Sequence, residues 1–290
     1  MSKVGFIGLG IMGKPMALRL HRADVPIVGY ARRAERRAEL AASGLALADT
    51  PRLVAENADV VFIMVSDTRA VDDVLFGSTG IAPVLKRGAI VVDMSTIDPL
   101  TTRALADRLQ ALGVDMLDAP VSGGEQGAIA GTLSIMIGGA ARCVEQVRPL
   151  FEHLGKNIVH VGDHGAGQIA KACNQLVVAQ TLTAIAEAFT LAHSAGVDPG
   201  KVREALLGGF AYSRALDVHG QRMLTANYQP GFKSALHNKD LHIVLDTARA
   251  LGVALPGTAL SAQWMNLAAH YRPDADSSVI FEIIPKGTKT

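Results

Sequence analysis

Three polar side chains close together in the chain could carry acid–base chemistry. Lys171 is followed by Asn174 and Gln175, three and four positions later, so on a helix all three side chains face one side. Reduction of a carbonyl needs a proton donor at the oxygen, and a partly buried lysine can have its pKa lowered enough to exchange protons near neutrality. A lysine on a helix is usually solvated, but the apolar sequence around Lys171 and the two nearby amides favour a catalytic role. Lys171, Asn174 and Gln175 are therefore candidate catalytic residues.

A glycine-rich turn near the start of the chain has the spacing of a dinucleotide-binding turn. It follows an apolar segment at residues 3–7 that predicts a buried strand, and it precedes a helical segment at residues 16–20. Gly8 would permit the tight turn, Gly10 would let the backbone approach a pyrophosphate, and Gly13 would let the helix pack on the strand. The alternative is a turn without a ligand, which the strand–turn–helix context disfavours. The predicted cofactor-binding residues of this turn are Gly8, Leu9, Gly10, Ile11, Met12 and Gly13.

The residues after the second predicted strand bear on the choice of cofactor. An acidic residue here would hydrogen-bond the adenosine ribose, but the chain has Ala31. Arg32 and Arg33 follow, and their guanidinium groups could bind a 2′-phosphate. The alternative is that both belong to a solvated helix face with Arg36 and Arg37. The local chemistry favours NADP(H) over NAD(H).

Two further segments leave predicted strands at their carboxyl ends, where ligands of open α/β sheets bind. Met64, Val65 and Ser66 leave the predicted central strand, and Thr96 follows another strand. Thr96 could hydrogen-bond the cofactor near the nicotinamide, or Ser95 or Thr96 could instead cap the next helix. The sequence leaves these two interpretations open.

Ser122, Gly123 and Gly124 follow the last predicted strand of the core and could bind a substrate carboxylate. Backbone amides beside a hydroxyl can hold an anion without a fixed charge. The competing interpretation is an ordinary glycine-rich loop.

The remaining polar residues give weaker signals. Lys239 is a second cation available to a cofactor or substrate anion, although taken alone it would be a surface residue. The nine histidines show no spacing typical of zinc sites, so we predict no metal. Cys143 and Cys173 fit neither a disulfide framework nor a thiolate metal site, which favours a reducing compartment.

The composition is that of a globular chain without affinity for polyanions. The 290 residues are 49% hydrophobic and 19% charged, and their formal net charge is +1. This balance provides no overall field for a nucleic acid, so we expect no such partner. The sequence shows no signal-peptide pattern, and we expect even its longest apolar stretches to be too short to cross a bilayer. We therefore expect no membrane partner and a cytoplasmic location.

Up to about residue 162, short β-branched runs alternate with helical segments. This alternation predicts an α/β fold with a Rossmann-type, doubly wound and mostly parallel sheet. The run at residues 60–65 shows no polar alternation, as expected for a central strand covered on both faces. The other predicted strands lie at residues 27–30, 89–93, 114–118, 133–137 and 158–161.

After residue 162 nearly all of the sequence has a helical pattern. A long segment at residues 168–195 is apolar around most of its circumference, which predicts burial in a domain centre or against a partner chain. Shorter helices are predicted to follow, with breaks at residues 198–200, 229–231 and 255–257. The sequence thus predicts a dinucleotide-binding domain at residues 1–162 and an all-α domain at residues 163–290, which begins with a long helix.

Four ordered motifs resemble those of the β-hydroxyacid dehydrogenase family, and the resemblance runs nearly end to end. In order, they resemble its cofactor signature, its substrate loop, its catalytic helix and a late segment that contacts the cofactor. The motifs are Phe6-Ile7-Gly8-Leu9-Gly10-Ile11-Met12-Gly13, Asp118-Ala119-Pro120-Val121-Ser122-Gly123-Gly124, Gly167-Gln168-Ile169-Ala170-Lys171-Ala172-Cys173-Asn174-Gln175 and Lys239-Asp240-Leu241.

The resemblance implies NAD(P)-dependent reduction of a semialdehyde, with Lys171 as general acid/base and Asn174 or Gln175 as its supporting amide. By the same resemblance, the carboxylate binders are Ser122, Gly123 and Gly124, and the residues near the nicotinamide are Thr96, Phe232 and Lys239. Residues 213–220 and 230–233 resemble members that reduce tartronate semialdehyde to D-glycerate. Relatives that use NAD often have an acidic residue where Ala31 stands, so their cofactor preference is not carried over.

Other activities of the same family remain open. They include oxidation of 3-hydroxyisobutyrate and reduction of glyoxylate or succinic semialdehyde, because a single methyl or hydroxyl group discriminates substrates weakly. A remote alternative is a non-catalytic cofactor-binding scaffold, which Lys171 and the serine–glycine loop disfavour. Family members usually assemble through the helical domain, so we expect a homodimer or homotetramer.

Overall fold

The computed structural model describes residues 2–32 and 34–284. The backbone contacts divide the chain into two compact units, Met1–Lys171 and Ala172–Thr290. Helix α8 (Ala166–Ser194) begins in the first unit and continues into the second. The domain boundary at residue 162 stays a prediction.

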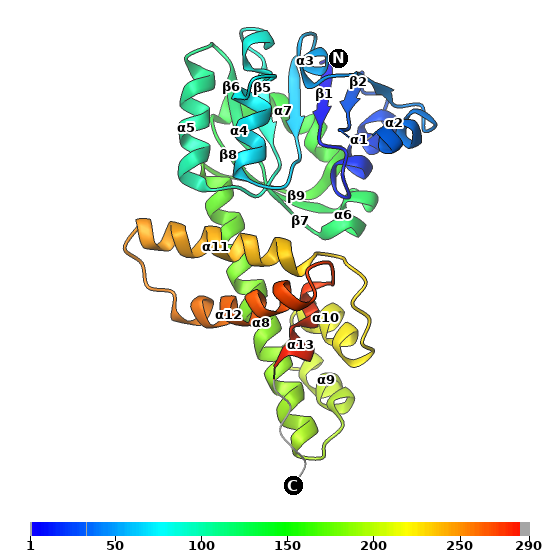
Figure 1. The fold of residues 1–290 in the computed structure, drawn as a ribbon, viewed down its shortest axis with the longest axis vertical. Helices are drawn as coiled ribbons and strands as arrows, with labels where there is room; N and C mark the ends of the chain where they lie inside the picture. Colours follow the sequence, from blue (N-terminus) through cyan, green and yellow to red (C-terminus); the bar gives the residue numbers. More distant parts are fainter. Residues whose placement is uncertain (1, 33, 285–290) are drawn as a thin grey trace. The chain divides into compact units, whose positions relative to one another are not determined.

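The first unit is built on one sheet of nine strands (Figure 1). The strand order is β3-β2-β1-β4-β5-β6-β8-β7, with β9 paired to β8. The first six strands in this order are parallel to one another, whereas β8 runs antiparallel to β6 and β7. The strands are β1 (Val4–Ile7), β2 (Ile27–Tyr30), β3 (Ala46–Leu47), β4 (Val60–Ile63), β5 (Ile90–Asp93), β6 (Asp115–Asp118), β7 (Val121–Ser122), β8 (Leu133–Gly138) and β9 (Gly155–Gly162). The predicted Rossmann-type, mostly parallel sheet is confirmed.

Helices cover both faces of this sheet. Core residues of α1, α6 and α7 pack on one face, and those of α3, α4 and α5 pack on the other. The helices of this unit are α1 (Gly13–Arg22), α2 (Ala34–Ala41), α3 (Pro51–Ala55), α4 (Thr68–Phe76), α5 (Pro99–Gln110), α6 (Gly124–Ala130) and α7 (Ala141–Leu154), with a 3-10 turn η1 (Ala82–Val84). Because both faces are covered, all residues of β1, β4 and β5 are buried, and these strands have no polar alternation.

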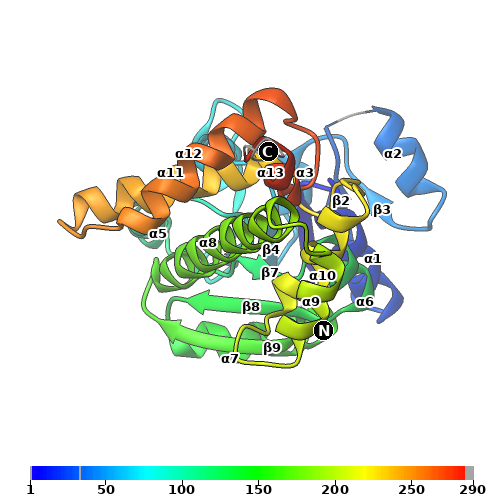
Figure 2. The same cartoon turned by 90° about the horizontal axis from the view of Figure 1, so that it is seen from below.

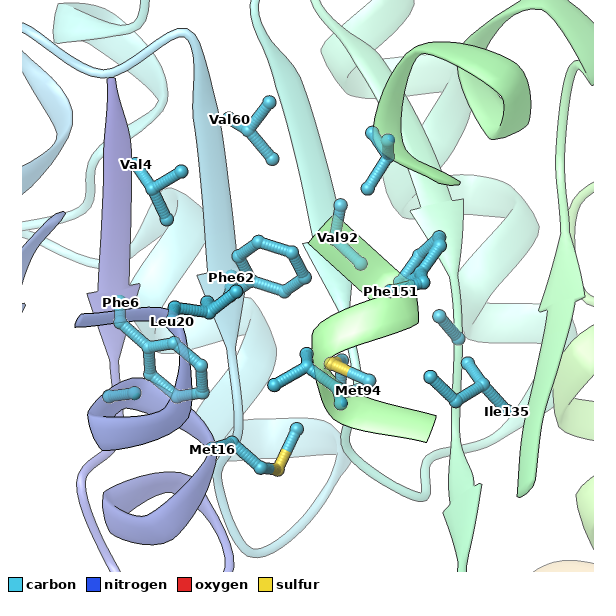
Figure 3. Close-up of a cluster of buried hydrophobic side chains, with 14 of the residues drawn as sticks. Val4, Phe6, Met16, Leu20, Val60, Phe62, Val92, Met94, Ile135 and Phe151 are labelled. Atoms are coloured by element: carbon cyan, nitrogen blue, oxygen red, sulfur yellow. The ribbon is translucent and has the colours of Figure 1, made fainter. Parts of the chain in front are cut away.

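Aromatic packing fills the core on the α1 and α7 side (Figure 3). Phe6 of β1 stacks on Phe62 of β4 with 5.7 Å between ring centroids. Phe151 of α7 meets Phe62 edge-on at 6.1 Å. These contacts hold the first and fourth strands together, and both strands lead into segments predicted to bind the cofactor.

The strand order reverses at β1, which lies between β2 and β4. In open α/β sheets, ligands bind outside the carboxyl ends of the strands at such a reversal. β4 ends at Ile63, two residues earlier than the sequence pattern predicted. Met64 and Val65 therefore lie in the loop beyond the strand, because the paired register stops at Ile7 and Asp93 of the two neighbouring strands.

The second unit is helical. Figures 1 and 2 both show α11 and α12 lying side by side. The helices beyond α8 are α9 (Pro199–Leu207), α10 (Arg214–Leu224), α11 (Ser234–Ala250), α12 (Pro256–Tyr271) and α13 (Ile280–Ile283), with a 3-10 turn η2 (Ser277–Val279). Phe189 of α8, Met265 of α12 and Phe281 of α13 belong to one buried core. Asp198 and Ser213 cap the starts of α9 and α10 with their side chains.

Helix α8 differs from its prediction in one respect. Its 29 residues are enough, by length and composition, to cross a membrane, so the expectation that every apolar stretch is too short is wrong. The core helix of a globular protein meets the same criterion, which makes this weak evidence for a membrane span. Val177 and Leu191 are 58% and 72% exposed in the single chain, so the domain centre does not cover the whole helix, and burial against a partner chain stays a prediction.

Candidate active site

The glycine turn after β1 leaves room for a ligand at one position and none at two others. Gly8 has φ +99°, and a Cβ atom there would overlap the carbonyl group of Met64. A Cβ on Gly13 would overlap the carbonyl oxygen of Gly8, so α1 can begin this close to the turn only with glycine. A Cβ on Gly10 would meet nothing within 4 Å. The turn therefore fits a pyrophosphate at Gly10, before the first turn of α1.

The end of β2 carries no carboxylate. Ala31 is buried and Arg32 is exposed, and Arg33 lies outside the described residues. The Arg37 guanidinium donates to the carbonyl oxygens of Ala31 (3.1 Å) and Arg32 (3.2 Å). Arg37, which the sequence placed only on a possible solvated face, thus fixes the backbone where the adenosine ribose would bind.

The loops after β4 and β5 are tied together. The Val65 amide donates to the Ser95 hydroxyl at 3.0 Å, and the Ser95 amide donates to the Asp93 carboxylate at 3.0 Å. Asp98 caps α5 by accepting from the Thr101 amide at 2.6 Å. The capping interpretation of Ser95 and Thr96 is therefore wrong, because α5 begins further along the chain.

Asp118, at the end of β6, fixes the start of α8. Its two carboxylate oxygens accept from the amides of Gly165 (2.8 Å) and Gln168 (3.0 Å). Burial raises the pKa of Asp118, although these backbone hydrogen bonds act in the opposite direction. A Cβ on Gly167 would come within 3 Å of the Asp118 carboxylate and main chain, so this close approach requires glycine.

The loop at residues 122–124 leaves its backbone accessible. Ser122 ends β7 and is half-buried, while Gly123 is exposed. Gly123 and Gly124 have φ values of +137° and +60°, which side-chain-bearing residues rarely adopt. The successive glycines turn the chain into α6 directly after Ser122, and the carboxylate site at these residues stays a prediction.

Lys171 is buried, with 6% of its surface exposed. It lies on α8, one turn after Gln168. A lysine with so little exposure is uncommon, because its charged form loses hydration. This burial distinguishes Lys171 from an ordinary surface lysine.

In the second unit, four polar side chains form a continuous chain. The Asn174 amide donates to the Gln175 side-chain oxygen at 2.8 Å, and the Gln175 amide donates to the Asp240 carboxylate at 2.6 Å. The ammonium of Lys239 lies 2.9 Å from the other oxygen of Asp240. Asp240 is 2% exposed, so it holds an amide and a cation from a buried position. The structure thus brings Asn174, Gln175 and Lys239 together around a carboxylate to which the sequence analysis gave no role.

Phe232, two residues before α11, is held by Asp276. The amides of Gly231 and Phe232 donate to one Asp276 oxygen at 3.0 and 3.1 Å. The Phe232 ring also lies 5.5 Å from the His237 ring, centroid to centroid. Asp276 therefore sets the backbone at a residue predicted to lie near the nicotinamide.

Asp276 is fully buried and surrounded by donors. Burial alone would raise its pKa, but the hydrogen bond and charge of His219, with the donations from Ser278, hold the pKa well below its usual value. Arg222 adds a guanidinium contact at 2.9 Å. The carboxylate is thus charged throughout the ordinary pH range.

Gln168, Asp240 and Asp276 are the functional candidates that sequence reasoning missed. Asp240 lies 65 positions from its partner Gln175, and Gln168 lies 73 positions from its partner Ser95. No local spacing in the sequence signals contacts between residues so far apart. The positions of Gln168 and Asp240 inside two of the motifs were the available signal. Within the described residues, no group of three or more His, Cys, Asp or Glu residues could hold a metal ion.

A Rossmann-type sheet with a glycine turn at the strand reversal defines the first unit as a dinucleotide-binding domain. Comparison with known families agrees. Residues 3–162 match the NAD binding domain of 6-phosphogluconate dehydrogenase, and residues 165–284 match the NAD-binding domain of NADP-dependent 3-hydroxyisobutyrate dehydrogenase. The chain belongs to the β-hydroxyacid dehydrogenase family and is an NAD(P)-dependent hydroxyacid dehydrogenase.

Individual relatives span nearly the whole chain. The chain is 49% identical to 2-hydroxy-3-oxopropionate reductase of Escherichia coli, over 92% of its own length and 91% of that protein. It is 35% identical to 3-hydroxyisobutyrate dehydrogenase of Pseudomonas aeruginosa, over 95% and 94% of the two chains. The solved structure of Mycobacterium tuberculosis 3-hydroxyisobutyrate dehydrogenase with L-serine is similar with a TM-score of 0.90 and 31% identity, covering 97% of this chain and 98% of that one.

Proposed function

We propose that the protein reduces tartronate semialdehyde (2-hydroxy-3-oxopropanoate) to D-glycerate, with Lys171 as the general acid/base. The observation that carries this proposal is the burial of Lys171 on α8, about one helical turn before Asn174 and Gln175. The 49% identity to 2-hydroxy-3-oxopropionate reductase supports this choice of substrate.

Each part of the site has a task in this proposal. The bound dinucleotide supplies or accepts a hydride. The dinucleotide is held by the turn from Gly8 to Gly13 and by the segment from Met64 to Ser66. It is contacted near the nicotinamide by Thr96, Phe232 and Lys239. Ser122, Gly123 and Gly124 bind the substrate carboxylate through the hydroxyl and backbone amides. Lys171 gives its proton to the aldehyde oxygen, and Asn174 or Gln175 orients it.

We further propose that NADP(H) is favoured over NAD(H). The absence of a carboxylate at Ala31 removes the group that would bind a free ribose 2′-hydroxyl and repel a phosphate. The exposed Arg32, with Arg33, supplies positive charge for a 2′-phosphate.

The proposed assembly and location rest on the exposed apolar side chains and on the cysteines. Exposed apolar side chains on α8 and beyond it, among them Leu191, Val197 and Phe210, support a homodimer or homotetramer that covers the helical unit. We propose a cytoplasmic location, in keeping with two cysteines that form no disulfide.

Initial rates test the proposed substrate. NADPH oxidation is measured with tartronate, methylmalonate and succinic semialdehydes and with glyoxylate, and each is repeated with NADH. The proposal expects the highest kcat/KM with tartronate semialdehyde. Preference for methylmalonate semialdehyde would instead indicate a 3-hydroxyisobutyrate dehydrogenase.

A further inference from the structure

Gln168 joins the loop after β5 to the helix that carries Lys171. Its side chain is 1% exposed and uses both ends of its amide. The nitrogen donates to the Ser95 carbonyl oxygen at 2.8 Å, and the oxygen accepts from the Ile97 amide at 3.2 Å. A backbone carbonyl can only accept and a backbone amide can only donate, so these partners fix the orientation of the Gln168 amide.

These two hydrogen bonds fix the backbone at Ser95 and at Ile97, on either side of Thr96. Gln168 is itself held, because its backbone amide donates to Asp118 at 3.0 Å. Ser95 is tied in turn to the loop after β4 through its bond from the Val65 amide. Lys171 follows Gln168 on α8 after one turn.

We propose that Gln168 is a positioning residue that sets Thr96 and Lys171 relative to each other. This inference rests on the proposed function, in which Thr96 contacts the nicotinamide and Lys171 moves the proton. Hydride and proton must arrive at neighbouring atoms of one carbonyl group, so a small displacement between the two residues slows the reaction more than it weakens binding.

The first test compares a variant of Gln168 with a control variant on the same helix. Gln168→Met keeps length and approximate volume but makes neither hydrogen bond. Gln180→Met is the control, since Gln180 lies on α8 and donates to the Thr258 hydroxyl at 3.1 Å, away from any residue assigned to the site. For each we would measure kcat, KM for both substrates, NADPH affinity and the primary deuterium isotope effect with deuterated NADPH.

For Q168M the inference expects kcat to fall about 10- to 100-fold, with NADPH affinity and KM changed by less than about threefold. The isotope effect should rise, because hydride transfer becomes more rate-limiting. Q180M should keep wild-type kcat and isotope effect. The inference is wrong if Q168M retains kcat within about twofold of wild type, or if its NADPH affinity falls as much as kcat does.

Gln168→Glu gives a second test if Q168M folds poorly. A neutral carboxyl group at this position can both donate to Ser95 and accept from Ile97, whereas the ionised group can only accept. The activity of Q168E relative to wild type should therefore rise as the pH falls. A ratio close to one would mean that the buried carboxyl stays neutral and keeps both hydrogen bonds, as the inference allows, whereas a ratio that stays low at every pH would overturn the inference. If the wild type itself turns over none of the semialdehydes, the proposed function fails, and this inference fails with it.

Discussion

The side-chain amide of Gln175 donates a 2.6 Å hydrogen bond to the buried carboxylate of Asp240, 65 positions later in the chain. Because Asp240 also binds the Lys239 ammonium, one carboxylate organises an amide and a cation that lie on different helices. Replacing Asp240 should therefore disturb the positions of both the Gln175 amide and the Lys239 ammonium.

Asp240→Asn should lower kcat/KM about 10- to 100-fold, because it removes a charge-assisted bond to Gln175 and the counter-ion of Lys239. Steady-state kinetics and a thermal melt would separate this effect from unfolding. Asp246→Asn is the matched control, since Asp246 lies on α11 in an exposed ion pair with Arg249. Equal kinetics for D240N and wild type would show that the network has no role in turnover.

Two glycines of the first turn should respond differently to alanine. Gly8→Ala should destabilise the fold, because its Cβ would overlap the Met64 carbonyl and its φ is +99°. Gly10→Ala should fold normally, because nothing lies within 4 Å of that Cβ, yet NADPH affinity should fall about tenfold or more. Thermal melts and NADPH fluorescence titration measure the two effects. A G10A protein that binds NADPH as tightly as wild type would argue against a pyrophosphate at this turn.

The cofactor preference should depend on the residues after β2. Ala31→Asp combined with Arg32→Ala should shift the ratio of kcat/KM values from NADPH towards NADH by about 10- to 100-fold, because it adds a ribose acceptor and removes a phosphate donor. Arg69→Ala, at an exposed arginine of α4, is the control for loss of one positive charge. If the double variant keeps the wild-type ratio, the ribose end of the cofactor lies elsewhere.

Asp276 should give the stability a characteristic acid dependence. Its pKa is lower in the folded protein than in the unfolded chain, so its contribution is present above the unfolded value of about 4 and is lost as the pH falls further. Asp276→Asn should therefore lower the free energy of unfolding by about 3 kcal/mol at pH 7, and by progressively less below about pH 4.

Urea denaturation of wild type and D276N between pH 3 and 7 measures this difference. Asp246→Asn serves again as the exposed control and should change stability by less than about 0.5 kcal/mol. A D276N difference that is constant across this range would contradict the assigned pKa direction.

The sequence predicted the α/β sheet and its helical continuation because these depend on local patterns. Buried strands such as β4 are continuous apolar runs, and the breaks at residues 198–200 and 255–257 contain the prolines that start α9 and α12. The end of β4 was misplaced, since Met64 and Val65 are as apolar as the strand but have no partner register. The residues that hold the site together could not be predicted, because Gln168, Asp240 and Asp276 act through partners distant in the chain.

The most direct test of the central claim compares Lys171→Ala with wild type in NADPH-dependent reduction of tartronate semialdehyde, with NADPH affinity measured in parallel. Lys201→Ala, at an exposed lysine of α9, is the control. The account predicts that K171A loses about 10²- to 10⁴-fold in kcat while NADPH affinity stays within about threefold of wild type. Turnover by K171A at the wild-type rate would show that Lys171 does not move the proton.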